Sequence, residues 1–251
     1  MKQVPTVFFP QLSVRAYSFP QSWGKGEKGY FFPSLIGNIE QETEFSQKTW
    51  IWAEQIHGTE VVVVKHGRIP KSPLKGADGI VTNRRDVLLI VKHADCVPIF
   101  LFDRVKRVIG LVHSGWRGTL GKIGLVALHQ MMVAFGSQVR DIHIALGPAA
   151  QACCYRKPKD SIFTQLPEWQ EYVESKDGEI AVNLLGFITQ MFREAGIKPG
   201  RITDCGICTI HNRDFWSWTR QRDQGEERGM GVSVLGLKKA YGKQQMERES
   251  V

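Results

Sequence analysis

No stretch of the sequence is long and apolar enough to cross a membrane as a helix, because it holds no run of about eighteen apolar residues. The first residues, MKQVPTVFFPQLSV, also lack the apolar core and the small-residue cleavage site of a secretory signal. These two absences predict a cytoplasmic protein with no membrane partner.

The sequence contains few cysteines. There are five, namely Cys96, Cys153, Cys154, Cys205 and Cys208. An odd number in a chain of this size fits reduced thiols and metal ligands better than a disulfide framework. These cysteines are therefore candidates for metal binding or for nucleophilic chemistry.

The sequence also lacks a nucleic-acid-binding motif. The net charge is +8, from 33 Lys and Arg against 25 Asp and Glu. The basic residues are spread along the chain, apart from a small cluster at Lys238, Lys239 and Lys243. Because no motif accompanies this charge, we expect no nucleic-acid partner.

No repeat, low-complexity tract or Gly/Ser linker divides the 251 residues, so we predict a single domain over residues 1–251. Residues 79–82 and 87–91 are expected to form a pair of strands, and the charged turn 103–107 predicts a hairpin. Apolar runs predict strands at 61–64, 79–82, 87–91, 98–102, 108–112 and 142–146. Helices are expected at 122–135, 160–175 and 183–195, and late strands near Ile207 and 215–218. This mixture predicts an α/β fold with mixed sheets flanked by helices.

Three short segments place a soft-metal ligand beside a turn-forming residue at the end of a predicted strand. They are QIHG at 55–58, ADCVP at 94–98 and HSGWRG at 113–118. Taken singly, a histidine or cysteine in an apolar region is more often a packed core residue. Taken together, His57, Cys96 and His113 form a set of two imidazoles and one thiolate, and three protein ligands with one open position are typical of catalytic zinc.

The neighbours of these residues resemble a known family. The blocks QIHGTEV, ADGIVT, ADCVPIFLFD, HSGWRGTLGKI and LGPAAQACCY occur in this order and are similar to the signature blocks of the YfiH-like family, also called the multi-copper polyphenol oxidoreductase or laccase-domain family. The segment EIAVNLLGFITQMFREAGIKPGRI, followed by CGICT, extends the resemblance over roughly residues 50–235.

The resemblance implies a four-layer α/β/β/α fold with mixed β-sheets, and it implies His57, Cys96 and His113 as zinc ligands. Members of the family are described as purine nucleoside phosphorylases and adenosine deaminases, as polyphenol oxidases, and as a factor that corrects peptidoglycan precursors. These activities differ, so the chemistry of the residues must decide among them.

Laccase chemistry needs several coppers held by many histidines, typically in closely spaced pairs. The seven histidines are scattered, without a His-x-His pair, at positions His57, His66, His93, His113, His129, His143 and His211. Multi-copper oxidation is therefore not expected, although a site of this composition would also accept a copper ion.

A single open zinc site suits hydrolytic deamination, because the metal lowers the pKa of a bound water toward about 7. Asp95 is the expected proton acceptor. For phosphorolysis, the Arg117 guanidinium can hold phosphate through two hydrogen bonds. We predict a zinc-dependent purine nucleoside phosphorylase or adenosine deaminase acting on adenosine, inosine or methylthioadenosine, with Cys96, Asp95 and Arg117 as catalytic residues and a purine nucleoside and phosphate as its small-molecule partners.

Two other functions use the same residues. Cys96 with His113 or His57 as its base would make a cysteine-type hydrolase or amidase that acts on peptidoglycan precursors or other amides. A fourth protein ligand, for which His93 is a candidate, would instead close the site and leave a non-catalytic metal-binding module. On a straight strand His93 and Cys96 would face opposite sides, so this chelate requires a bend before Cys96.

Several further residues carry weaker signals. Cys205-x₂-Cys208-x₂-His211 has the spacing of a zinc or redox motif, but a single CxxC without a second pair favours buried strand cysteines instead. Cys153-Cys154 is interpreted as packing or pocket wall. Trp116 and Phe215 or Trp218 are candidates for stacking on a purine, and Arg220 and Arg222 for the pocket entrance.

Two departures from the family pattern bear on the substrate pocket. The segment FPSLIGNIEQETEFSQKTW is shorter than the family's corresponding region, and the family's CCYE is replaced by Cys153-Cys154-Tyr155-Arg156. The second change exchanges a carboxylate for a cation.

Overall fold

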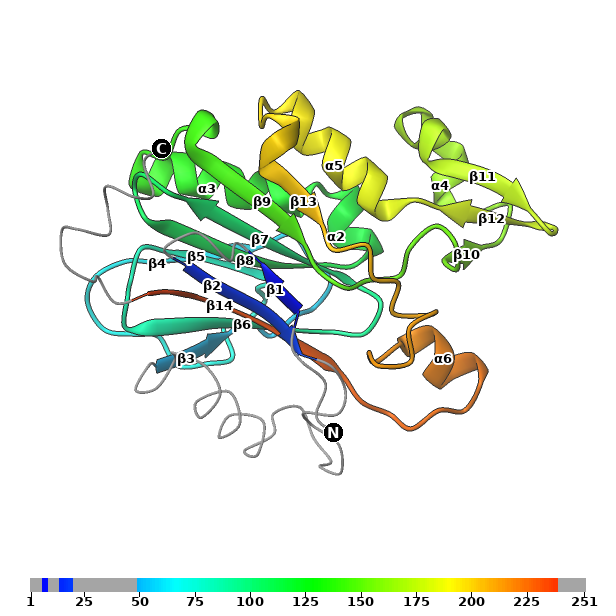
Figure 1. Ribbon diagram of the computed structural model, residues 1–251, viewed down its shortest axis with the longest axis horizontal. Coiled ribbons are helices and arrows are strands. Elements are labelled where there is room, and N and C mark those ends of the chain that lie inside the picture. The colour runs from blue at the N-terminus through cyan, green and yellow to red at the C-terminus, as the bar shows by residue number, and fades with distance from the viewer. Residues whose placement is uncertain (1–5, 9–13, 20–48, 239–251) are drawn as a thin grey trace.

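The computed structural model describes residues 6–8, 14–19 and 49–238. Their strands form two large sheets that pack face to face (Figure 1). None of the described helices has the length and apolarity required to cross a membrane.

The larger sheet has six strands in the order β13-β9-β7-β8-β5-β4. The strands are β4 (Val61–Val64), β5 (Gly79–Thr82), β7 (Val97–Asp103), β8 (Val108–Ser114), β9 (Ile142–Leu146) and β13 (Ile202–Asp204). β4 runs parallel to β5 and β13 parallel to β9, whereas the other neighbours are antiparallel, so the sheet is mixed.

The second sheet has five strands in the order β1-β2-β14-β6-β3. The strands are β1 (Thr6–Phe8), β2 (Val14–Phe19), β3 (Thr49–Trp52), β6 (Val87–His93) and β14 (Gly231–Leu237). Every residue of β6, β7, β8 and β14 is buried, which explains why these strands form nearly continuous apolar runs.

Helices cover the face of the six-stranded sheet that points away from the second sheet (Figure 1). They are α2 (Trp116–Leu120), α3 (Ile123–Phe135) and α5 (Leu184–Glu194). One apolar core lies between these helices and the sheet, and a second lies between the two sheets, where Leu89 and Val91 meet Phe100 and Leu111. The predicted α/β class with mixed sheets is confirmed. Among the described residues, no helix covers the far face of the five-stranded sheet, where the second helical layer of the α/β/β/α order was expected.

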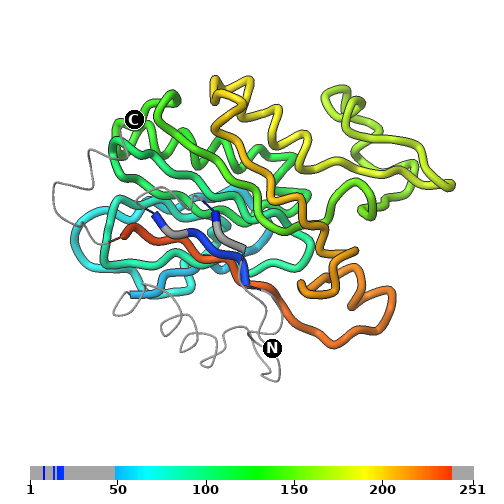
Figure 2. The backbone as a smooth tube through the Cα atoms, viewed as in Figure 1, coloured from blue at the N-terminus to red at the C-terminus, as the bar shows by residue number. Residues whose placement is uncertain are grey.

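A smaller unit extends the molecule beyond α5 (Figure 2). It holds the three-stranded sheet β10-β12-β11 and the short helices α4 and η3. The bounds are β10 (Arg156–Lys157), α4 (Ile162–Gln165), η3 (Pro167–Tyr172), β11 (Val173–Lys176) and β12 (Glu179–Val182). η2 (Val139–Asp141), η4 (Pro199–Arg201) and α6 (Trp218–Asp223) complete the helices of the described residues.

The hairpin of β7 and β8 and the helices at α3 and α5 are confirmed. The single helix predicted at 160–175 is confirmed only in part. Residues 162–165 and 167–172 form the separate short helices α4 and η3, divided before Pro167, and residues 173–176 pair with β12 instead. Asp177 and Gly178 both have positive φ, as a tight hairpin turn requires.

The strands expected at 79–82 and 87–91 are confirmed as β5 and β6, but they lie in different sheets and do not pair with each other. The strand expected at 215–218 is wrong, because residues 215–217 form a loop and Trp218 begins α6. The Ser217 hydroxyl accepts a hydrogen bond from the Arg220 amide and caps that helix. Ile207 lies outside the described strands, although Cys208 next to it forms a single bridge to Ala149.

Candidate active site

The three predicted metal ligands lie at or near the ends of strands, two of them where the chain passes between the two sheets. His57 follows β3 of the five-stranded sheet and precedes β4 of the six-stranded sheet. Cys96 lies in the same kind of crossing, between β6 and β7, and His113 is near the end of β8. Loops anchored on two rigid sheets can hold side chains in fixed positions, so the crossing point is a suitable place for a metal or catalytic centre.

The structure brings these three side chains together. One ligand atom from each of His57, Cys96 and His113 lies within 4.8 Å of the others. The two imidazole rings are 4.8 Å apart at their centroids and meet edge to face at 83°. Two nitrogens and one sulfur at this spacing suit a tetrahedral zinc ion with one position left open. Their binding of zinc stays a prediction.

Asp78 fixes both imidazole segments. Its carboxylate accepts hydrogen bonds from His113 Nδ1 at 2.9 Å and from the backbone amides of Ile56, His57 and Gly58 at 3.1, 2.9 and 2.7 Å. Asp78 is fully buried. A carboxylate bound to Nδ1 leaves Nε2 of His113 as the nitrogen available to a metal, which is the usual support for a metal-binding histidine.

The charges of the three ligands are coupled. Burial alone would raise the pKa of the Cys96 thiol, but His113 and His57 outweigh it and lower that pKa to about 6. Burial would lower the pKa of His113, but the Cys96 thiolate and Asp78 raise it to about 9. The pKa of Asp78 is lowered because hydrogen bonds from His113 and the loop amides outweigh its burial. Without metal, the site at neutral pH is therefore a thiolate and imidazolium pair.

Backbone strain collects at this site. Gln55, His57 and Asp95 all have positive φ, at 66°, 63° and 81°. Such conformations disfavour side chains with a Cβ by about 1–3 kcal/mol each, and they persist only where surrounding contacts impose them. Gln55 shows one such contact, because its side chain bridges the backbone N and O of Lys92 at 2.8 and 2.5 Å.

Gly115 has no side chain, and this allows His57 and Cys96 to pack directly against its backbone. A Cβ at this position would lie 2.8 Å from His57 Cδ2 and 3.1 Å from Cys96 Sγ. We expect Gly115→Ala to separate the ligands and weaken zinc binding by about tenfold or more, measured by zinc titration. Gly200→Ala is the matched control, because nothing lies within 4 Å of its added Cβ. Equal zinc affinity in the two variants would contradict this packing argument.

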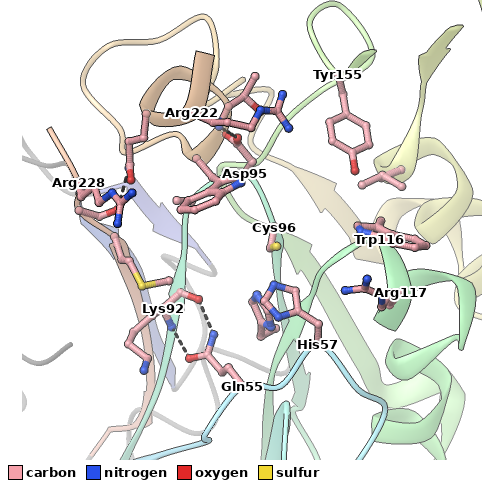
Figure 3. A pocket seen from close by; sticks show the side chains of 18 of the residues that line it. Gln55, His57, Lys92, Asp95, Cys96, Trp116, Arg117, Tyr155, Arg222 and Arg228 are labelled. Carbon is pink, nitrogen blue, oxygen red and sulfur yellow. Dashed lines mark hydrogen bonds between the residues drawn. The ribbon is translucent and has the colours of Figure 1, made fainter. Parts of the chain in front are cut away.

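A cavity of 1070 Å³ opens over the three ligands (Figure 3). Its lining is rich in cations, with five against three carboxylates. The cations are Lys92, Arg117, Lys157, Arg222 and Arg228, and the carboxylates are Glu54, Asp95 and Glu227. An excess of positive charge in a concave site favours an anionic ligand.

Arg117 is placed to hold an anion. Its guanidinium lies over the Trp116 ring at 4.6 Å and points toward the side of the cavity where His57 lies (Figure 3). It is exposed, and within the described part of the chain it has no carboxylate partner. An arginine oriented by stacking keeps its donors available for an oxyanion.

The aromatic candidates divide between cavity and core. Trp116, Trp218 and Tyr155 line the cavity, whereas Phe215 is buried and is not among its lining residues. Burial raises the pKa of Tyr155 well above its usual range, so its hydroxyl remains a proton donor at neutral pH.

Asp95 lines the cavity, but its carboxylate is held by other residues. Oδ1 accepts a hydrogen bond from Thr209 at 2.7 Å, and Oδ2 accepts from the Ser217 hydroxyl at 3.1 Å and the Thr219 amide at 2.7 Å. These bonds join the Cys96 loop to the start of α6. The geometry favours a positioning role for Asp95 over the proton acceptor expected from the sequence.

Two other expectations are modified by the structure. Arg220 was expected near the pocket entrance with Arg222, but it is buried and bonds to the backbone of Thr209, Ile210 and Phe215. Arg222 does line the cavity. His93, considered as a fourth ligand, bonds to Ser233 at 2.8 Å instead and lies outside the ligand cluster.

Five residues of the site are not predicted from the sequence, namely Asp78, Lys92, Lys157, Tyr155 and Arg228. Asp78 and Tyr155 lie within the quoted blocks ADGIVT and LGPAAQACCY, so the signal for these two was present. Lys92 lies on β6, and Arg228 lies in the segment before β14. β6 and β14 pair with each other in the sheet, so only the fold brings these two cations together at the cavity.

Comparison with known proteins gives a consistent family. Residues 36–238 match the sequence model of the family described as "Multi-copper polyphenol oxidoreductase laccase". "Purine nucleoside phosphorylase YlmD" of Bacillus subtilis is 30% identical over 77% of this chain and 72% of its own length. "Purine nucleoside phosphorylase CA_C1699" of Clostridium acetobutylicum is 38% identical over 66% of this chain and 68% of its own.

Solved structures agree with the fold. The hypothetical protein YfiH of Bacillus licheniformis superposes with a TM-score of 0.77 at 26% identity and covers 93% of this chain and 96% of its own. YlmD of Geobacillus stearothermophilus gives a TM-score of 0.77 at 23% identity over 95% of this chain and 98% of its own, which shows the shared fold.

Proposed function

Because the chain belongs to the family described as multi-copper polyphenol oxidoreductase laccase, with relatives named purine nucleoside phosphorylase, we propose that it cleaves purine nucleosides with phosphate at the cavity over His57, Cys96 and His113. The observation that carries the proposal is the joining, in one cavity, of an open three-ligand metal set and an excess of cations.

In phosphorolysis, a phosphate oxygen forms a bond to C1′ of the ribose while the bond from C1′ to the purine nitrogen breaks. The bonding electron pair leaves with the purine, which takes up a proton, and ribose 1-phosphate is the second product. Arg117 would hold the attacking phosphate through two parallel hydrogen bonds, and Tyr155 would supply a proton donor in the cavity.

The metal that fits the donor set best is zinc, held by His57, Cys96 and His113. When bound there, zinc supplies a Lewis acid that stabilises negative charge near the reacting atoms. Asp78 keeps His113 oriented, and the strained loop at His57 keeps the second imidazole in place. Copper would bind the same ligands, but the described residues place only two histidines in this cluster, fewer than multi-copper oxidation needs.

Adenosine deamination is a second activity that this site would support, because an open metal position can hold a water molecule. The cysteine hydrolase alternative rests on the interaction between Cys96 and His113. Metal removal distinguishes the cysteine hydrolase from both metal-dependent activities, since a cysteine nucleophile needs no stoichiometric metal.

The direct test incubates purified protein with adenosine, inosine and methylthioadenosine, with and without phosphate, and follows free base and ammonia. Free base that appears only with phosphate, together with ribose 1-phosphate, is the expected result. Ammonia release without free base would identify a deaminase instead, and neither product from any of the three nucleosides would refute the proposal.

Replacing Arg117 by alanine should raise the KM for phosphate and lower kcat/KM by about 100-fold, because a preorganised donor to the reacting anion is lost. Arg140→Ala is the matched control, since Arg140 is exposed at η2 and does not line the cavity. Unchanged phosphorolysis in Arg117→Ala would remove this residue from the mechanism.

Zinc affinity should depend on pH in a defined way. Between pH 6 and 9 the metal-free site carries a Cys96 thiolate and a protonated His113, so zinc must displace one proton. The affinity should rise about tenfold per pH unit across this window, more steeply below it, and level off above it. Zinc titrations at a series of pH values measure this slope, and a flat profile would contradict the assigned protonation states.

A further inference from the structure

A second group of potential metal ligands lies outside the cavity. β9 and β13 are parallel neighbours, and the segments that follow them continue side by side. The Ala149 amide bonds to the Ile207 carbonyl, and the Thr209 amide bonds to the Ala149 carbonyl. The turns beginning at Gln151 and Cys208 are therefore held against one another.

These turns gather three thiols and an imidazole. The Cys154 amide bonds to the Gln151 carbonyl in one turn, and the Asn212 amide bonds to the Cys208 carbonyl in the other. The Sγ atoms of Cys153 and Cys154 are 3.4 Å apart, and one ligand atom from each of Cys153, Cys154 and His211 lies within 4.8 Å of the others. The buried Cys208 thiol interacts with both neighbouring thiols.

The spacing suits a metal ion better than a disulfide. Zinc binds sulfur at about 2.3 Å and nitrogen at about 2.0 Å, so two ligand atoms of one tetrahedral ion lie about 3.5–3.8 Å apart. Consecutive residues have Cα atoms about 3.8 Å apart, below the range of about 4.4–6.8 Å that a disulfide prefers. Three thiolates and one imidazole form a closed set typical of structural zinc.

We propose that Cys153, Cys154 and His211 bind a second zinc ion, with Cys208 as its fourth ligand. Cys153 and His211 are exposed, so the ion has access from solvent, and none of the four residues lines the active-site cavity. Arg156 supports this turn, because its guanidinium donates a hydrogen bond to the Cys153 carbonyl at 3.1 Å.

The ion would join two loops that support the active site. Tyr155 follows Cys154 and lines the cavity, and Thr209 follows Cys208 and bonds to Asp95. The role of this zinc is structural, since its four positions are filled by protein. It does not depend on which reaction the cavity catalyses.

Zinc titration of the reduced, metal-free full chain tests the proposal, with elemental analysis of the loaded protein. We expect two zinc ions per wild-type chain, and one in Cys153→Ser/His211→Ala, where both changed side chains are exposed. One ion is also expected in His57→Ala/Cys96→Ser, which removes only the cavity site. Cys205→Ser is the matched control and should keep two, because Cys205 belongs to neither ligand group.

Cobalt titration gives a second readout, because the thiolate-to-cobalt absorption grows with the number of thiolate ligands. The His57→Ala/Cys96→Ser protein should retain the stronger part of this absorption, and Cys208→Ser in that background should reduce it. No zinc in the His57→Ala/Cys96→Ser chain, or two ions in Cys153→Ser/His211→Ala, would overturn the proposal. Neither outcome depends on phosphorolysis.

Discussion

Replacing Cys96 by serine is expected to remove zinc from the cavity and lower phosphorolysis by at least about 100-fold. The reason is chemical, because a thiolate is a metal ligand at neutral pH and a serine hydroxyl does not ionise there. Cys96 sits on the crossing between the two sheets, within reach of both imidazoles. The measurements are kcat/KM for adenosine with phosphate and the zinc content of the purified chain.

Cys205→Ser is the control for Cys96→Ser, since it removes one thiol outside both ligand groups. Full activity in Cys96→Ser would contradict the assigned role. A Cys96→Ser protein that keeps its cavity zinc but loses activity would indicate a nucleophilic cysteine, which is the alternative that Cys96 and His113 also permit.

Replacing Asp78 by asparagine is expected to weaken zinc binding by about 10–100-fold. The three ligands stay in place, but His113 loses the carboxylate at its Nδ1, and an amide nitrogen comes to face amides of residues 56–58. The free energy of unfolding should also fall, by about 1–3 kcal/mol, because buried donors lose their acceptor. Zinc titration and chemical denaturation measure the two effects.

Excess zinc should restore most of the activity of Asp78→Asn and none of that of Cys96→Ser, because only the first variant keeps all three ligands. Asp86→Asn is the matched control, since its carboxylate is exposed and pairs with Arg84 at the surface. Zinc affinity in Asp78→Asn equal to that of the control would show that the carboxylate does not support the site.

The grouping of His57, Cys96 and His113, the proposed ligands, is predictable from the sequence because each lies in a short block that follows or ends a strand. Hydrophobic periodicity found most strands and both long helices, but it does not tell which sheet a buried strand joins. β5 and β6 illustrate this, since both are apolar and yet they lie in different sheets. Because β6 belongs to the five-stranded sheet and β7 to the six-stranded sheet, the chain crosses between the sheets at Cys96.

The remaining site residues depend on tertiary structure. The role of Asp78 follows from hydrogen bonds to two separate segments, and that of Asp95 from contacts more than a hundred positions away along the chain. The incorrect end of the helix predicted at 160–175 has a local cause. The Asp177-Gly178 pair is typical of a hairpin turn and indicates strands on either side of it, but the helical pattern of the preceding residues was given more weight. The proposed second zinc site could not be derived from the spacing of Cys208 and His211 alone, because its ligands come from two separate loops.

The most direct test of the account measures phosphorolysis against cavity zinc in a chain carrying Cys153→Ser and His211→Ala, so that only the His57, Cys96 and His113 site is counted. The account predicts that activity disappears on zinc removal and returns in proportion to zinc, reaching its maximum at one ion per chain. Full activity in the zinc-free chain would contradict it.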